Sequence, residues 1–483
     1  MSGYWAGILT ILAINIIFAY GIFLPVATGQ LNLGGAGFQA IGAYGAAFLS
    51  ASFGLPVPVT IGVGMAIAGI TGFVIAFPLL RTRGVYLVLA TFAFAEVVGG
   101  LILNSDTFGG AMGLSVPAFI DWHVPVTAAV VVTLFVFYLM STRFGLTMRA
   151  AHDDEVVTDL MGVNVRSIQV AAFAIGGALA GLAGGLYAHS FNFVEIQSFN
   201  ALVSIYVLLY VLLGGTQTAW GPLAGATFFT MLPEALRTVL PALKSGIYSL
   251  AGVEGAVPAP DDSWRFVILG ALTIAMMVFR PEGLITRTMI ERFGFHRSRA
   301  GKGALGMTAL MSLTNVSKNF GGLAVITDVS FDVLAGARMA LIGPNGAGKT
   351  TIFNLISGVY QPSAGEIRLE GQEISAIPSR ERIGLGIARS FQNIRLMPHL
   401  SVLENVMLGQ QARAGNLGNM LSPLRRSRWR REAEELLEQM GLDTYPGEVV
   451  ATLPYGIRKK IEVVRALVAK PKLLMLDEPA WPG

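Results

Sequence analysis

A glycine-rich segment in the C-terminal half carries the residue types that hold nucleotide phosphates. It reads Gly-Pro-Asn-Gly-Ala-Gly-Lys-Thr-Thr and satisfies the G-x-x-x-x-G-K-[ST] pattern, in which backbone N–H groups close around phosphate oxygens at a helix N-terminus. Lys349 is expected to reach the β and γ phosphates, and the Thr350 hydroxyl to bind Mg²⁺. The expected nucleotide contacts are Gly343, Pro344, Asn345, Gly346, Ala347, Gly348, Lys349, Thr350 and Thr351.

Two acidic residues that could take part in catalysis follow an apolar stretch, Lys472 to Leu476, which is predicted to be a strand. Asp477 and Glu478 come directly after it, so one carboxylate can hold the Mg²⁺ shell and the next can orient an attacking water. Taken alone, two acids after a strand are more often a strand-to-loop cap. The phosphate loop about 130 residues upstream favours the hydrolytic interpretation.

The phosphate loop needs a strand before it and a helix after it. Arg338 to Ile342 is predicted to be a buried strand that runs into the loop. Leu310 to Phe320 and Val325 to Val333 read as two further short strands. This part of the chain is therefore predicted to be an α/β domain.

The N-terminal half has a different composition. The whole chain is 53% hydrophobic and 13% charged, and no Asp, Glu, Lys or Arg precedes Arg81. The sequence contains no cysteine, which excludes disulfides, thiolate metal sites and a Cys nucleophile. The N-terminal half is therefore predicted to lie in a membrane, and nothing in the sequence supports nucleic-acid binding.

About nine segments are long and apolar enough to cross a bilayer as helices. They run from Tyr4 to Val26, Leu31 to Phe53, Val57 to Leu80, Val85 to Leu103, Val124 to Met140, Ile168 to Ser190, Ala201 to Leu213, Pro222 to Leu240 and Trp264 to Phe279. The first two are the weakest, because the glycines at 29, 34, 35, 37 and 42 could break the second helix.

Basic residues in short loops predict the orientation of these spans. The arginines cluster at 81 and 83, at 143, 149 and 166, and at 280, 287 and 292, which predicts cytoplasmic loops there. The N-terminus and the stretches 104–123, 191–200 and 241–263 then lie outside. We therefore divide the chain into a transmembrane permease domain (1–280), a linker (281–307) and a partial nucleotide-binding domain (308–483).

The order of four motifs resembles an ABC ATPase: the phosphate loop, Arg389-Ser-Phe-Gln392, Leu453-Pro-Tyr-Gly456 and Leu476-Asp-Glu-Pro479. The Ser-Phe-Gln and Tyr-Gly forms are most similar to ATPases of branched-chain amino acid importers. The resemblance implies ATP and Mg²⁺ as cofactors, Glu478 and Gln392 as catalytic residues, and Thr350, Gln392 and Asp477 at the metal. It also implies that Gly456 lies at the start of the signature helix.

Two departures and one alternative accompany this resemblance. Pro454 lacks the hydroxyl of the usual signature, and Ile457 lacks its polar end. The resemblance implies that Phe320 stacks on adenine; from the sequence alone it is an aromatic at a strand end, and packing into the core is the alternative.

The membrane half resembles the matching permease in stretches such as Asn32 to Phe38, Arg81 to Leu87 and Phe279 to Gly283. Arg149 to Asn164 resembles the cytoplasmic segment that contacts the ATPase; a plain solvated loop is the alternative. Glu96 is an acid within an apolar span, which predicts either a place facing the bundle interior or a water path, or a bond to backbone or hydroxyl groups.

A basic run, Arg425, Arg426, Arg428, Arg430 and Arg431, reads first as a solvated helix face and second as a membrane-surface contact. Lining of a substrate path by Tyr44, Tyr86 and Thr91 is a further hypothesis.

The fold class that follows is a polytopic α-helical membrane domain of about nine spans, followed by an incomplete α/β P-loop ABC ATPase domain. The resemblance implies ATP-driven import of branched-chain amino acids across a bacterial inner membrane, with a cytoplasmic ATPase. The expected partners are a second permease, a second ATPase, a periplasmic substrate-binding protein, membrane lipid and a small amino acid or amide.

Three alternatives stay open. Urea or short amides could be the cargo, and the ATPase part could be non-catalytic. An ABC exporter is a third class, although its six spans with long cytoplasmic extensions differ from the short loops here. Because the resemblance places a D-loop and a switch histidine after the catalytic Glu, we expect ATP hydrolysis only where missing elements or partners complete the domain.

Overall fold

The computed structural model describes residues 3–250, 270, 271, 274, 309–343, 346–391, 394–414, 420, 421, 423, 424 and 428–477, with backbone only at 236 and 238–250. The chain forms two compact units. One contains Met1–Met140 and Arg166–Ile290, and the other contains Ser141–Val165 and Glu291–Gly483.

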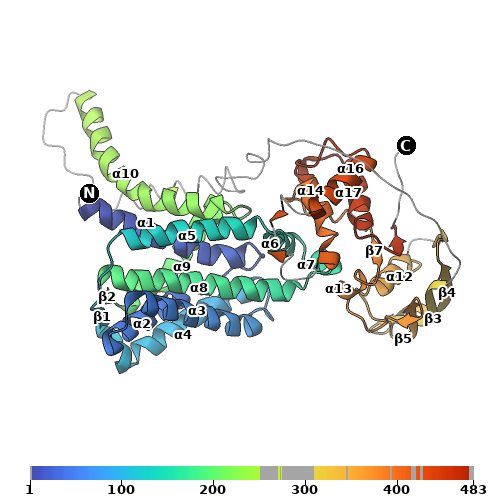
Figure 1. The fold of residues 1–483 in the computed structure, drawn as a ribbon, viewed down its shortest axis with the longest axis horizontal. Helices are drawn as coiled ribbons and strands as arrows, with labels where there is room; N and C mark the ends of the chain where they lie inside the picture. Colours follow the sequence, from blue (N-terminus) through green and yellow to red (C-terminus); the bar gives the residue numbers. More distant parts are fainter. Residues whose placement is uncertain are drawn as a thin grey trace. The chain divides into compact units, whose positions relative to one another are not determined.

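The first unit is helical (Figure 1). Its helices are α1 (Gly3–Val26), α2 (Gly35–Phe53), α3 (Val57–Leu79), α4 (Val85–Leu103), α5 (His123–Met140), α8 (Val165–Phe191), α9 (Ala201–Gly214) and α10 (Trp220–Leu250). Six stretches in the described residues have the length and composition of membrane spans: α1, α3, α4, α5, α8 and Ile196–Gly214. The unit is thus a membrane domain of six or more apolar helices. The ninth predicted span, Trp264 to Phe279, lies largely outside the described residues.

The second predicted span begins later than expected. Residues 31–34 are not helical, and α2 starts at Gly35. The glycines inside α2 do not break the helix. They let neighbouring helices approach closely, since a Cβ on Gly42 would lie 2.1 Å from the Gly181 carbonyl oxygen of α8. The glycines that made this span doubtful are therefore packing residues.

Two contacts bear on the predicted sidedness of the loops. Strand β1 (Leu114–Ser115) pairs with β2 (Phe193–Val194), so two loops predicted to lie outside meet each other. At the opposite helix ends, the Arg166 guanidinium donates to the Phe77 carbonyl at 3.2 Å. Both contacts agree with the alternating order of the spans.

Glu96 does not lie inside this chain's helical bundle, and its predicted place on a water path stays a prediction. Glu96 is exposed on α4, on the side that also carries the exposed Leu89 and Val97, rather than inside this chain's bundle. Tyr44 and Thr91 are instead 1% exposed and pack within the unit, and Tyr86 is exposed.

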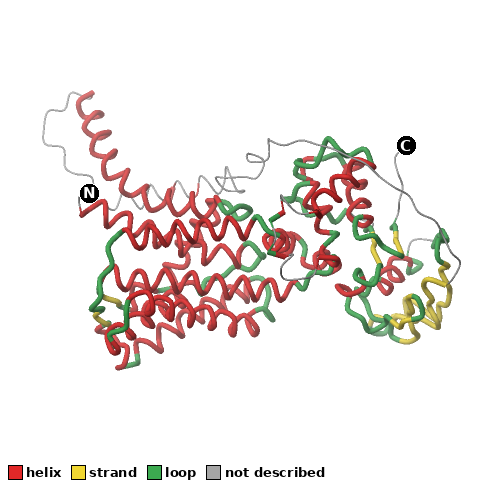
Figure 2. Tube along the Cα trace, viewed as in Figure 1, coloured by secondary structure: helices red, strands yellow, loops and turns green. Residues whose placement is uncertain are grey.

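The second unit contains two sheets (Figure 2). The larger is antiparallel, in the order β4-β3-β5-β6, from β3 (Ala309–Phe320), β4 (Leu323–Leu334), β5 (Ala364–Leu369) and β6 (Gln372–Glu373). This confirms the strands predicted before the phosphate loop. In the smaller sheet β7 (Ile387–Arg389) and β8 (Leu473–Met475) are parallel, which confirms the strand predicted before Asp477.

The strand predicted from Arg338 to Ile342 is wrong. These residues form no strand, and Ile342 is 89% exposed. The apolar pattern predicted a buried strand, but no described strand lies beside residues 338–342 to satisfy their N–H and C=O groups.

The helices of this unit are α6 (Arg143–Asp153), α7 (Glu155–Leu160), α12 (Lys349–Ile356), α13 (Ser379–Arg382), α14 (Val402–Leu408), α16 (Arg428–Gln439) and α17 (Tyr455–Leu467). One apolar core joins residues of α14, α16 and α17 with Leu146, Ala150 and Val157 of α6 and α7. The segment between spans α5 and α8 therefore shares a core with the nucleotide-binding part.

Candidate nucleotide site and its docked permease segment

The phosphate loop ends at the start of α12, as its pattern predicts. Gly346 and Gly348 have φ of 85° and 82°, a left-handed conformation that glycine adopts without strain. The Lys349 ammonium donates to the Gly343 carbonyl at 2.5 Å, so it folds back over the loop. The Thr350 side chain is exposed beside it, and Pro344 and Asn345 lie outside the described residues. The described residues thus fit a phosphate group.

Gly348 is also required by packing. A Cβ there would come within 2.4 Å of Ile326 Cδ1 on β4. The loop glycine therefore serves both the backbone turn and its contact with the antiparallel sheet.

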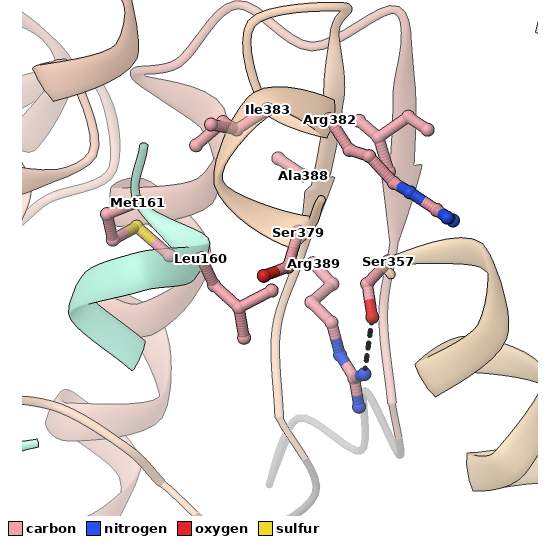
Figure 3. A pocket seen from close by; sticks show the side chains of 9 residues that line it. Leu160, Met161, Ser357, Ser379, Arg382, Ile383, Ala388 and Arg389 are labelled. Atoms are coloured by element: carbon pink, nitrogen blue, oxygen red, sulfur yellow. Dashed lines mark hydrogen bonds between the residues drawn. The ribbon is translucent and has the colours of Figure 1, made fainter. Parts of the chain in front are cut away.

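Arg389 links the helix of the phosphate loop to the end of β8, and Figure 3 shows its hydrogen bond to Ser357. Its guanidinium donates to Asn354 Oδ1 at 2.7 Å and to Ser357 Oγ at 3.1 Å, both on or next to α12. The same group lies 3.7 Å from Asp477 Oδ2. Burial lowers the pKa of Arg389, and the Asp477 charge opposes that shift.

Asp477 lies where the sequence placed it, directly after β8. It is 7% exposed, and its N–H donates to Ser390 Oγ at 3.2 Å. Gln392 and Glu478, the two predicted catalytic residues, lie outside the described residues. Their predicted roles remain predictions.

Phe320 ends β3 and is 42% exposed, so it does not pack into the core. Its ring meets Tyr360 edge-on with centroids 5.0 Å apart, and the Lys318 ammonium lies 5.1 Å from its centre. The exposure of Phe320 excludes the alternative that it packs into the core. An exposed ring next to a cation suits stacking on a base, and adenine stacking stays a prediction.

The signature helix α17 begins as predicted. Pro454 occupies its N-cap position with an extended backbone, and Gly456 lies in its first turn. Ile457, which departs from the usual polar residue, packs against the apolar core. The departure therefore has a local structural role.

Glu462 on α17 holds the residues on both sides of Gln392. Its Oε1 accepts from the N–H groups of Phe391 and Arg395, each at 3.3 Å, and the Lys459 ammonium lies 3.2 Å from its Oε2. Glu462 is fully buried. No local sequence pattern marks Glu462, so it could not be predicted from the sequence.

The segment between α5 and α8 docks on the nucleotide-binding part through a buried ion pair. Arg149 Nη2 lies 2.9 Å from Glu404 Oε1, with the two side chains 8% and 11% exposed. The Oε2 of the same Glu404 accepts from the Ser401 N–H, in a capping box at the start of α14. This confirms that the segment touches an ATPase surface and excludes a plain solvated loop.

Three further contacts complete the docking. Ser379 donates to Asp159 at 2.5 Å, and the Arg395 guanidinium lies 3.1 Å from Asp154. Arg143 donates to Gln411 at 3.2 Å, and burial lowers its pKa to about 10.

α13 connects this surface to the phosphate loop. Ser379 begins α13 and Arg382 ends it, and Arg382 donates to the Leu355 and Ile356 carbonyls at 2.6 and 2.9 Å. Those carbonyls end α12, so Arg382 caps the helix that carries the phosphate loop. A small pocket lies here, lined by Leu160, Met161, Ser357, Ser379, Arg382, Ile383, Ile387, Ala388 and Arg389 (Figure 3).

A polytopic helical domain, a phosphate loop and a signature helix on one chain define a membrane permease joined to a P-loop ABC ATPase. Two family models match accordingly: the branched-chain amino acid transport system / permease component over residues 4–277 and the ABC transporter over residues 326–481. The chain belongs to the branched-chain amino acid transport permease family and carries an ABC ATPase domain. It is a multi-pass inner-membrane protein whose ATPase domain is cytoplasmic.

Curated relatives match the ATPase part. The chain is 36% identical over 179 residues to the high-affinity branched-chain amino acid transport ATP-binding protein BraF of Pseudomonas aeruginosa, covering 35% of this chain and 69% of BraF. It is 35% identical over 177 residues to LivG of Escherichia coli, described in the same words, with 35% and 69% covered. A solved ABC transporter ATP-binding cassette in its ADP conformation is 28% identical, with TM-score 0.33 and 36% and 71% covered.

Proposed function

We propose that this ABC importer carries branched-chain amino acids inward across the bacterial inner membrane and uses ATP as its energy source. The observation that carries the proposal is the pairing of two parts on one chain. The permease part belongs to a branched-chain amino acid transport family, and the ATPase part is similar to ATP-binding proteins named for the same cargo.

The chemistry proposed for the site follows from its residues. Lys349 and the loop N–H groups hold the triphosphate, and Phe320 stacks on adenine. Thr350 and Asp477, with Gln392, would hold Mg²⁺, which neutralises phosphate charge when bound. Glu478 orients the attacking water, and Gly456 presents the N-terminus of α17 to the nucleotide of a partner ATPase.

Transmission to the membrane is proposed to use the docked segment. Arg149 and Asp159 hold α6 and α7 to α14 and α13, and Arg395 links Asp154 to the backbone held by Glu462. A movement of Phe391, which precedes Gln392 in the sequence, therefore has a route through Glu462 and Arg395 to the segment joining spans α5 and α8. A second permease, a second ATPase and a periplasmic binding protein complete the proposed machine.

Competition in whole cells tests the cargo. Cells lacking other leucine uptake, but expressing this chain and its partners, should take up labelled leucine, and excess isoleucine or valine should suppress that uptake. Excess urea or acetamide should not. Suppression by urea but not by valine would replace the proposed cargo with urea or a short amide.

A further inference from the structure

The first turn of α16 carries three arginines, at positions 428, 430 and 431, and acidic residues follow toward its C-terminus. A helix dipole favours acids at the N-terminus and bases at the C-terminus, so this order works against the helix. A charge arrangement that lowers local stability points to a role outside the helix itself.

Two of the three arginines present their charge to the surroundings. Arg430 pairs with Glu434 at 2.8 Å, and Glu432 is already paired with Arg413 at 3.1 Å. Arg428 and Arg431 are exposed, and neither has a carboxylate partner within the described residues. They form a patch of two positive charges at the start of α16.

The chain just before this patch is bonded to the two residues that directly follow span α5 in the sequence. The Leu424 N–H donates to the Ser141 carbonyl at 3.0 Å, and Thr142 and Pro423 form an antiparallel bridge. Ser141 directly follows Met140, the last residue of span α5.

A side-chain contact fixes the same proximity. The Arg143 guanidinium lies 5.0 Å from the centre of the Trp429 ring, and Trp429 stands next to Arg428 on α16. Three residues of chain reach at most about 11 Å, so Arg143 cannot be far from the point where α5 leaves the lipid. The Debye length at physiological salt is about 8 Å, so an attraction between the patch and an anionic leaflet would depend strongly on salt.

We propose that Arg428 and Arg431 bind the phosphate groups of anionic phospholipids in the cytoplasmic leaflet and hold this side of the ATPase domain at the membrane. Basic residues near an anionic leaflet gain electrostatic energy that a merely solvated helix face does not. Arg425 and Arg426 lie outside the described residues and are not needed for the site. The proposal is independent of the cargo and of nucleotide chemistry.

Fluorescence quenching in nanodiscs tests this contact. The chain has no cysteine, so one cysteine in place of Glu435, a turn beyond Arg431, carries a single fluorophore. Nanodiscs hold headgroup spin-labelled phosphatidylcholine, with or without phosphatidylglycerol. Phosphatidylglycerol should increase quenching, and high salt should reverse the increase. Free glycerol phosphate added to phosphatidylcholine discs should leave quenching unchanged, which separates lipid from a soluble phosphate.

Matched variants identify the charges responsible. R428Q/R431Q should lose the response to phosphatidylglycerol, with apparent lipid affinity reduced about fivefold for each charge removed. R428K/R431K should keep the response, and so should R368Q, which removes an exposed arginine on β5. If phosphatidylglycerol does not change the quenching, or if R428Q/R431Q keeps the response, the proposal is wrong and this end of α16 is only a solvated helix face. Loss of the response in R428K/R431K would also overturn the proposal, because a charge effect survives that change.

Discussion

Arg149 of α6 and Glu404 of α14 form an ion pair at 2.9 Å, although 255 residues separate them in the chain. Both side chains are nearly buried, so each charge depends on the other for compensation. The pair ties the segment between two membrane spans to the helix that follows the predicted Gln392 loop. It is the contact most directly open to test in the proposed transmission route.

Replacing Arg149 by Met should uncouple the two parts. Glu404 would be left buried without its cation, which costs about 3–5 kcal/mol of docking energy. We expect leucine uptake to fall at least tenfold while nucleotide affinity stays within twofold, measured by transport and by fluorescent-ATP binding on the same preparation. R380M, at an exposed pair with Glu381, is the matched control and should transport normally. Normal uptake by R149M would show that this ion pair carries no coupling.

Replacing Lys349 by Ala should abolish ATP binding and leave membrane insertion unchanged. The ammonium closes over the phosphate loop from within the second unit, and no described residue of the membrane helices contributes to that loop. ATP binding by filter assay and membrane fractionation report the two properties separately. K472A, at an exposed lysine paired with Glu370, should bind ATP as the wild type does. Intact ATP binding by K349A would refute the phosphate-loop assignment.

Phe320→Ala should weaken binding of ATP but not of inorganic triphosphate. Stacking of a base on an aromatic ring contributes about 1–3 kcal/mol, so we expect ATP affinity to fall roughly five- to hundredfold. Isothermal calorimetry with both ligands separates base from phosphate contacts. Equal losses for the two ligands would mean that Phe320 acts on the structure of the loop and not on adenine.

A cysteine at Val156 should react from the cytoplasm and not from the periplasm. Val156 is 53% exposed on α7, so the change spares the contacts of Asp154 and Asp159. A cysteine at Met112, 88% exposed in a loop predicted to lie outside, should show the opposite pattern. Labelling of intact cells with an impermeant maleimide distinguishes them. Reaction of the Val156 cysteine in intact cells would contradict the predicted topology, because it would place α7 on the periplasmic side.

The chemistry-bearing motifs were predictable from the sequence because phosphate binding restricts residue type and spacing within nine consecutive positions. The docking contacts were not, because they join residues far apart. The Ser401-x-x-Glu404 capping box was readable as a local pattern, but its partner Arg149 was not. Apolar periodicity also misled at residues 338–342, since a strand needs a neighbour that no local pattern supplies.

ATP on the cytoplasmic side is proposed to drive amino acid import through this chain. Proteoliposomes containing the chain, its partner subunits and the binding protein test it most directly, with labelled leucine presented on the binding-protein side and ATP on the ATPase side. We predict leucine accumulation above its external concentration, lost without ATP and lost in K349A. Accumulation that is equal with and without ATP, or unchanged in K349A, would contradict the claim.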